Sequence, residues 1–180
     1  VPAIAMRLWA EERKSGSIEL LMTLPITRTD AVLGKFLAAW VFAGIAPLLT
    51  FPMIITVNYL GQPDNGAIVT GYLGSWLLAG CFLAIGSCMS ALAKNQVIAF
   101  ILCVSVCLLF ILSGFPLVLD AFSQWAPQWL VDGIASLSFL TRFEAISKGV
   151  IDLRDLLYFV TLIAAWLAAT AVVLDLKKAD

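Results

Sequence analysis

Four long stretches of the chain contain no charged residue, and the charged residues gather between and outside them. A hydrocarbon core of about 30 Å needs about 20 apolar residues at helical rise, so each stretch is long enough to cross it. None shows the alternating pattern of a barrel strand, and an open strand would leave backbone groups unpaired in lipid. The pattern predicts an all-α, polytopic helical membrane protein with four transmembrane helices at 36–60, 71–93, 96–119 and 156–174.

Composition supports this class. Of the 180 residues, 62% are hydrophobic and 13% are charged, whereas soluble domains are about half apolar and a quarter charged. The net charge of -1 gives no basic field for nucleic acid, so no nucleic-acid partner is expected. The chain has no histidine, which removes the commonest catalytic base and metal ligand. We therefore expect no catalytic residue and no metal site.

The distribution of Lys and Arg predicts the orientation. Cytoplasmic loops near the membrane are enriched in these residues. Four spans place residues 1–35, the 94–95 turn and the 175–180 tail on one side, with eight of the eleven cations: Arg7, Arg13, Lys14, Arg28, Lys35, Lys94, Lys177 and Lys178. We expect this side to be cytoplasmic. Residues 1–9 are apolar except for Arg7, and we interpret them as the cytoplasmic end of a preceding span; a short interfacial helix is the alternative.

The region 11–35 contains a short amphipathic segment. A charged head, Glu11-Glu12-Arg13, precedes a run from Gly16 to Pro25. Gly16 can serve as N-cap, Glu19 lies near the positive end of the helix dipole, and Pro25 stops the helix. Spacings of three and four place three side chains on one face: Ile18, Leu21 and Met22. The pattern alone fits either a helix on lipid headgroups or one that docks into a groove of a soluble partner.

A second helix start follows, because Thr27 and Asp30 form a capping box ahead of the first span. That span carries residues that bend a helix or add polar groups, which makes them candidates for lining a pathway, although packing is an equal alternative. These are Pro47, Thr50, Pro52 and Asn58.

Small residues form stripes along two other spans, and such stripes let neighbouring helices approach closely. They are Gly80, Ala84, Cys88 and Ala91 in the second span, and Ala164, Ala168 and Ala171 in the last. All four cysteines lie in apolar runs, so we interpret them as packing residues. The region 120–155 is an extracytoplasmic loop by the same topology, and its apolar spacing predicts two short helices that dip into the outer leaflet or plug the exit; an interfacial lid with no gating role is an equal alternative.

Two strings resemble a known family. EERKSGSIELLMTLPITRTDAVLGKF at 11–36 resembles the first cytoplasmic loop of ABC-2 type transporter permeases, in particular the subfamily related to gliding-motility ABC permeases. SLSFLTRFEAISKGVIDLRD at 136–155 is similar to the outer loop of the same family. The expected spans lie between the two strings, so the resemblance covers nearly the whole chain.

The resemblance implies a transporter subunit with six spans in the intact chain, of which this sequence would hold the end of the second and the third to sixth. Two permease subunits pair, as a homodimer or a heterodimer, and each docks a separate ABC ATPase subunit through a cytoplasmic coupling helix. Carried onto this chain, the ATPase-docking residues are Glu11, Glu12, Arg13, Gly16, Ile18, Glu19, Leu21, Met22 and Pro25.

No phosphate-loop motif occurs in the sequence, so no cofactor is expected on this chain, and ATP and Mg would be bound by the partner ATPase. The four spans contain no ionisable residue, which disfavours an ion-coupled carrier and suits a hydrophobic or lipid-like cargo. We therefore expect a non-enzymatic permease subunit of an ATP-driven exporter, multi-pass in the cytoplasmic (inner) membrane and in contact with its lipid. A structural membrane anchor and an ion-coupled carrier are the alternatives.

Overall fold

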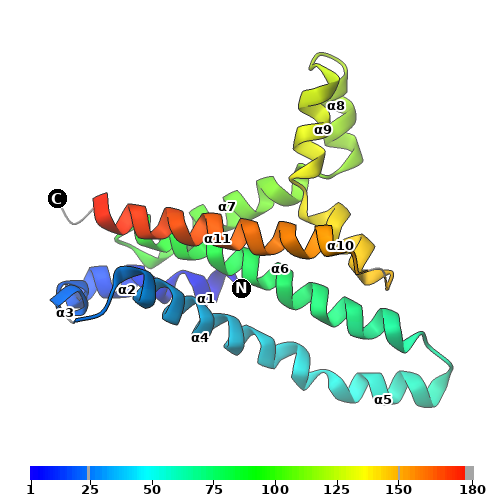
Figure 1. Cartoon of the computed structure of the whole chain (residues 1–180), viewed down its shortest axis with the longest axis horizontal. Coiled ribbons are helices and arrows are strands. Elements are labelled where there is room, and N and C mark those ends of the chain that lie inside the picture. The colour runs from blue at the N-terminus through cyan, green and yellow to red at the C-terminus, as the bar shows by residue number, and fades with distance from the viewer. Residues whose placement is uncertain (24, 150, 177–180) are drawn as a thin grey trace.

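A computed structural model describes residues 1–23, 25–149 and 151–176, and the side chains of Leu21 and Met22 also lie outside the described set. Every regular element in this part of the chain is an α-helix, which confirms the predicted all-α class (Figure 1). The helices are α1 (Pro2–Ala5), α2 (Arg7–Ser15), α3 (Ser17–Thr23), α4 (Arg28–Leu49), α5 (Phe51–Leu60), α6 (Asn65–Leu92), α7 (Gln96–Leu112), α8 (Pro116–Ser123), α9 (Gln128–Ser136), α10 (Phe139–Ser147) and α11 (Leu153–Leu176).

Helix α6 is the centre of the bundle and packs against α1, α2, α4, α7, α10 and α11. Its second half is almost wholly buried, including the predicted small-residue stripe of Gly80, Ala84, Cys88 and Ala91. Small side chains permit this close packing, as expected of membrane helices. All four cysteines are free and buried, in agreement with a packing role.

Three helical segments are long and apolar enough to cross a membrane: Arg28–Leu60, Asn65–Leu92 and Leu153–Leu176. They contain the predicted spans 36–60 and 156–174 and all of 71–93 except residue 93, and they begin earlier than the apolar runs. The first is interrupted at Thr50, between α4 and α5, where Pro47 and Pro52 flank the break. Proline has no backbone N–H group, so the helix loses hydrogen bonds at this point.

The predicted span 96–119 is not one straight helix. Together, helices α7 and α8 are long and apolar enough to cross a membrane, but the chain bends by 72° between Leu112 and Pro116. Pro116 disfavours a helical conformation in the residue before it. In addition, Ser138 packs directly against Gly114 and leaves no room for a Cβ atom there. The predicted fourth span is therefore a bent helix pair, with the geometry of either a broken span or a re-entrant loop.

Helix α11 buries a different face from the one that the sequence predicts. Phe159, Ile163, Leu167 and Thr170 pack against the bundle, whereas Ala164 and Ala168 are exposed. Within the described chain the predicted alanine stripe is therefore not the buried face; Ala164, Ala168 and Ala171 line a groove beside α4. The larger apolar residues occupy the buried face, because they remove more surface from the surroundings and fill the space beside α6.

The region 120–155 contains α9 and α10, as predicted, and part of α8. Figure 1 shows the α8–α9 hairpin projecting away from the bundle, while α10 lies against it. Phe139 and Ile146 of α10 are each 1% exposed, and α10 packs on α6. By contrast, Trp125 and Trp129 of the hairpin are 80% and 72% exposed. The two halves of this region therefore have different surroundings.

Candidate coupling region and membrane groove

Helix α2 is anchored to α6 by two buried serines. The hydroxyl of Ser90 accepts the backbone N–H groups of Trp9 and Ala10, each at 3.0 Å, and donates to the carbonyl of Met6 at 2.9 Å. The indole N–H of Trp9 donates to Ser87 Oγ at 3.0 Å. The first N–H groups of a helix lack partners within it. Ser90 supplies partners from α6, and so the break between α1 and α2 at Met6 remains hydrogen-bonded.

Charged residues add two further attachments. Lys35 of α4 forms an ion pair with Glu12 of α2, donates to the carbonyl of Leu8 at 2.9 Å, and lies 4.2 Å from the ring centroid of Trp9. Arg13 Nη1 donates to the carbonyl of Ala91 at 2.6 Å. A charge-assisted bond of this length is stronger than a neutral one. Helix α2 is therefore fixed to both α4 and α6.

The structure thus gives Glu12 and Arg13 partners within this chain, whereas the sequence suggested that they form the charged entry to a docking surface. Glu11, in contrast, is exposed and has no ion pair or side-chain hydrogen bond in the described part of the chain. The sequence shows no sign of this difference, because the partner of Arg13 is 78 positions away.

Gly16 separates α2 from α3. Its φ of 74° lies in the left-handed region, which glycine adopts without the cost that a side chain would add. Its carbonyl accepts the N–H of Glu19 at 3.3 Å. The sequence predicts Gly16 as the N-cap of the following helix; in the structure it is the C-cap of α2 and also stands directly before Ser17, the first residue of α3. Helix α3 ends at Thr23, before Pro25.

Helix α3 has a buried side and an exposed side. Ile18 is half-buried and packs against the core cluster, whereas Glu19 is exposed and Leu20 is 73% exposed. The remaining predicted docking side chains on this helix, those of Leu21 and Met22, lie outside the described set. Leu20 therefore offers an exposed apolar contact to a partner, with the carboxylate of Glu19 next to it in the sequence.

Thr27 is the N-cap of α4, which confirms one half of the predicted capping box; the Asp30 carboxylate accepts from the Thr27 hydroxyl. Thr27 Oγ1 accepts the N–H of Asp30 at 3.2 Å, and Arg28 forms an ion pair with Asp175 near the end of α11. The α3–α4 connection is thereby tied to the last span. We refer to this end of the bundle, where α2, α3 and the start of α4 meet, as the α3 end.

Of the candidate pathway residues, Pro47 lines the groove between α4 and α6 described below. Thr50 Oγ1 bonds to the carbonyl of Pro47 at 2.7 Å and to the hydroxyl of Tyr72 at 2.6 Å. The amides of Asn58 and Asn65 pair reciprocally at 2.9 and 3.1 Å. Pro52 is exposed in the first turn of α5. The side chains of Thr50 and Asn58 therefore join α4 and α5 to α6.

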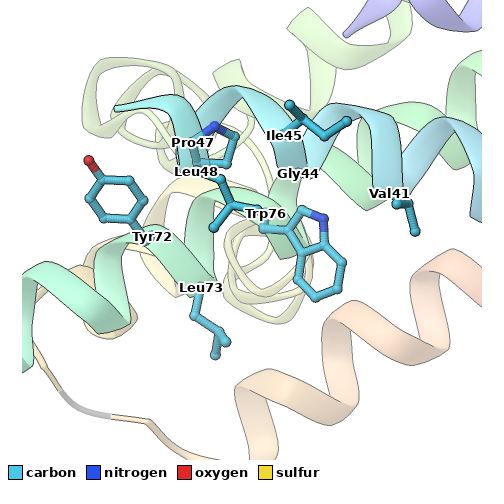
Figure 2. Close-up of a pocket in the computed structure, with 8 residues that line it drawn as sticks. All are labelled: Val41, Gly44, Ile45, Pro47, Leu48, Tyr72, Leu73 and Trp76. Atoms are coloured by element: carbon cyan, nitrogen blue, oxygen red, sulfur yellow. The ribbon is translucent and has the colours of Figure 1, made fainter. Parts of the chain in front are cut away.

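The groove around Pro47 lies between α4 and α6 and has a volume of about 360 Å³ (Figure 2). Its lining is apolar apart from the hydroxyl of Tyr72, and consists of Val41, Gly44, Ile45, Pro47, Leu48, Tyr72, Leu73 and Trp76. Several of these side chains, such as Leu48 at 73% exposed, face outward from the bundle. A groove of this composition accommodates a hydrocarbon group.

A pair of stacked tryptophans lies beside this groove, and one of them, Trp76, is part of its lining. Trp40 and Trp76 stack with ring centroids 4.4 Å apart, and each indole N–H donates to the other residue's carbonyl, at 2.9 and 3.1 Å. A Cβ atom on Gly44 would lie 2.8 Å from Trp76 Nε1, and one on Gly80 would lie 2.8 Å from Trp40 Nε1. Glycine at both positions gives the rings the space to stack.

An ion pair at the opposite end of the bundle was not anticipated from the sequence. Asp155 is 7% exposed and accepts from Arg142 Nη1 at 2.6 Å. Arg142 also lies 5.0 Å from the ring centroid of Tyr158. The pair joins α10 to α11, and so it fixes the half of the outer region that packs on the bundle.

Comparison with known proteins identifies the family to which this chain is similar. The model of the ABC-2 family transporter proteins matches residues 3–177. A protein described as "Probable ABC transporter permease protein NosY" of Pseudomonas aeruginosa is 32% identical over 53% of this chain and 38% of its own length. "Probable multidrug ABC transporter permease YbhS" of Escherichia coli K12 is 31% identical over 48% of this chain and 22% of its own length. The matched part of the chain thus spans well under half of each relative.

Proposed function

Because this chain belongs to the ABC-2 transporter family, we propose that it is the permease subunit of an ABC exporter, driven by a separate ATPase subunit. The family and the apolar helices make it a multi-pass membrane protein. The observation that carries the proposal is the two-sided character of the α2–α3 region. One side is bonded to the spans, and the other side presents Leu20 and Glu19 outward.

This arrangement supports a coupling role for Gly16 to Pro25. A partner that moves α3 also moves α2, because the two helices contact each other. Movement of α2 acts on α6 through Ser90 and Arg13, and on α4 through Lys35. Coupling between sites needs such a physical connection of packed and hydrogen-bonded groups. Glu11, Ile18, Leu21 and Met22 complete the proposed docking set.

The partners in this proposal are an ABC ATPase subunit that binds ATP and Mg, a second permease subunit and the membrane lipid. The subunit would lie in the inner membrane with its α3 end in the cytoplasm, as the cation distribution favours. The sequence stretches 11–36 and 136–155 favour the subfamily related to gliding-motility permeases. The apolar groove beside Pro47 supports a hydrophobic or lipid-like cargo. Thr50, Pro52 and Asn58 remain candidates for the same pathway.

A substitution at Leu20 tests the docking role. Leu20→Asp places a carboxylate on the exposed side of α3, where a docked partner would have to remove it from water at a cost of several kcal/mol. We expect the complete protein to insert into the membrane and to lose its ATPase subunit in a pull-down. Ile151→Asp is the matched control, because Ile151 is 54% exposed in the connection between α10 and α11, outside the predicted spans, and it should retain the ATPase. Equal retention by both variants would show that α3 is not the docking surface.

A further inference from the structure

Helix α5 is the least packed part of the first spanning segment. In the described part of the chain none of its residues is buried, and Tyr59 and Leu60 near its end are 91% and 78% exposed. Figure 1 shows α5 at the edge of the bundle, beyond the end of α4. Elements with few buried apolar contacts are the ones that open most easily. Apolar packing therefore contributes little to holding α5 against α6.

The break between α4 and α5 has the features of a hinge. Pro47 and Pro52 supply no N–H group to the carbonyls four residues before them, so the helical hydrogen bonds are interrupted on both sides of Thr50. Thr50 itself is held, because its hydroxyl lies 2.6 Å from the hydroxyl of Tyr72 on α6. Hinges are a few residues at the ends of elements that absorb a change in backbone angles. The break thus provides a pivot that is fixed to α6.

A pair of side-chain amides holds the far end of α5. Asn58 and Asn65 exchange hydrogen bonds at 2.9 and 3.1 Å, and among the described residues these are the only side-chain hydrogen bonds from α5 to another helix. The connection 61–64 between α5 and α6 bridges about 17 Å when extended, at about 3.4 Å for each of its five steps. The chain therefore allows the end of α5 to leave α6 once the amide pair opens.

We propose that α5 is a flap that swings about Thr50 and is latched to α6 by the amide pair of Asn58 and Asn65. Pro47 and Tyr72 lie together at one end of the apolar groove between α4 and α6 (Figure 2). Helix α5 begins next to that end, so release of the latch extends the groove toward the α5–α6 connection. The flap thereby controls access to the groove from this end of the bundle. The inference concerns a motion of the chain and holds whichever cargo the protein carries.

The distance between the end of α5 and the start of α11 measures the motion. Tyr59→Cys and Arg154→Cys provide attachment sites for two nitroxide labels in the complete protein in lipid nanodiscs. Both positions are exposed, whereas the four native cysteines are buried. Double electron–electron resonance then gives the distribution of label distances. We expect a main population with α5 against α6 and a second population at longer distance.

Asn58→Ala tests the latch. It removes both amide hydrogen bonds, and two bonds of the average strength measured within membranes correspond to an increase of about eightfold in the ratio of long to short distances. Thr56→Ala is the matched control on the same helix, because the hydroxyl of Thr56 bonds only to the carbonyl of Pro52 in α5. This control should show the distance distribution of the labelled protein without it.

Pro52→Ala tests the hinge separately. It restores a backbone N–H group beside the pivot and should reduce the population at long distance. A single distance that Asn58→Ala leaves unchanged would overturn the proposal and would show that another segment or a second copy holds α5. An equal gain from Thr56→Ala would refute the latch, and an unchanged distribution in Pro52→Ala would refute the pivot at Thr50. The measurement is a distance, so its failure leaves the proposed exporter function untouched.

Discussion

Ser90→Ala tests how α2 is attached to the spans. Ser90 is fully buried, and its hydroxyl takes part in three hydrogen bonds, with the N–H groups of Trp9 and Ala10 and the carbonyl of Met6. A buried hydrogen bond contributes about 1 kcal/mol net, and those within membranes average about 0.6 kcal/mol. The three bonds together therefore predict that opening of α2 from α6 becomes easier by about 2–3 kcal/mol.

Hydrogen–deuterium exchange of the complete protein measures this opening. A change of 2–3 kcal/mol corresponds to an increase of about 30- to 150-fold in the opening equilibrium, and it should be confined to the amides of Trp9, Ala10 and their neighbours in α2. Ser105→Ala is the matched control. Ser105 is exposed, and its hydroxyl bonds only to the carbonyl of Ile101 in its own helix. Unchanged exchange of Trp9 and Ala10 in Ser90→Ala would refute the attachment described here.

Two further predictions concern packing and topology. Gly80→Ala places a Cβ atom against the indole of Trp40 and should lower the stability in a thermal melt by about 1–3 kcal/mol. Gly34→Ala meets no neighbouring atom and should raise it by about 0.5–1 kcal/mol; a loss of the same size in both would contradict the packing argument. A cysteine at Asp64 should react with an impermeant reagent from outside the cell and one at Lys94 only from the cytoplasm. Labelling of Lys94 from outside would reverse the orientation.

The sequence predicted the features that depend on local patterns. The apolar runs revealed the spans because length and absence of charge are properties of one segment. The cap at Thr27 was found because both of its members lie within one turn. The bend before Pro116 also had a local signal, since proline constrains the residue before it, but the uncharged run concealed it.

Features that depend on contacts between distant segments were not predicted. The sequence suggested that Glu12 and Arg13 form a charged surface, yet their partners lie on α4 and α6. The exposed face of α11 with Ala164 was taken for a packing face, because spacing shows which residues share a face and not which face meets the bundle.

The central claim is that a separate ATPase drives transport through this subunit. The direct test is transport in sealed vesicles that contain the complete subunit, with and without its ATPase partner. The account predicts that transport requires the partner and ATP and persists after ionophores collapse the ion gradients, because the uncharged runs of the spans offer no ionisable group for ion coupling. Transport by the subunit alone, driven by an imposed proton or sodium gradient, would contradict it.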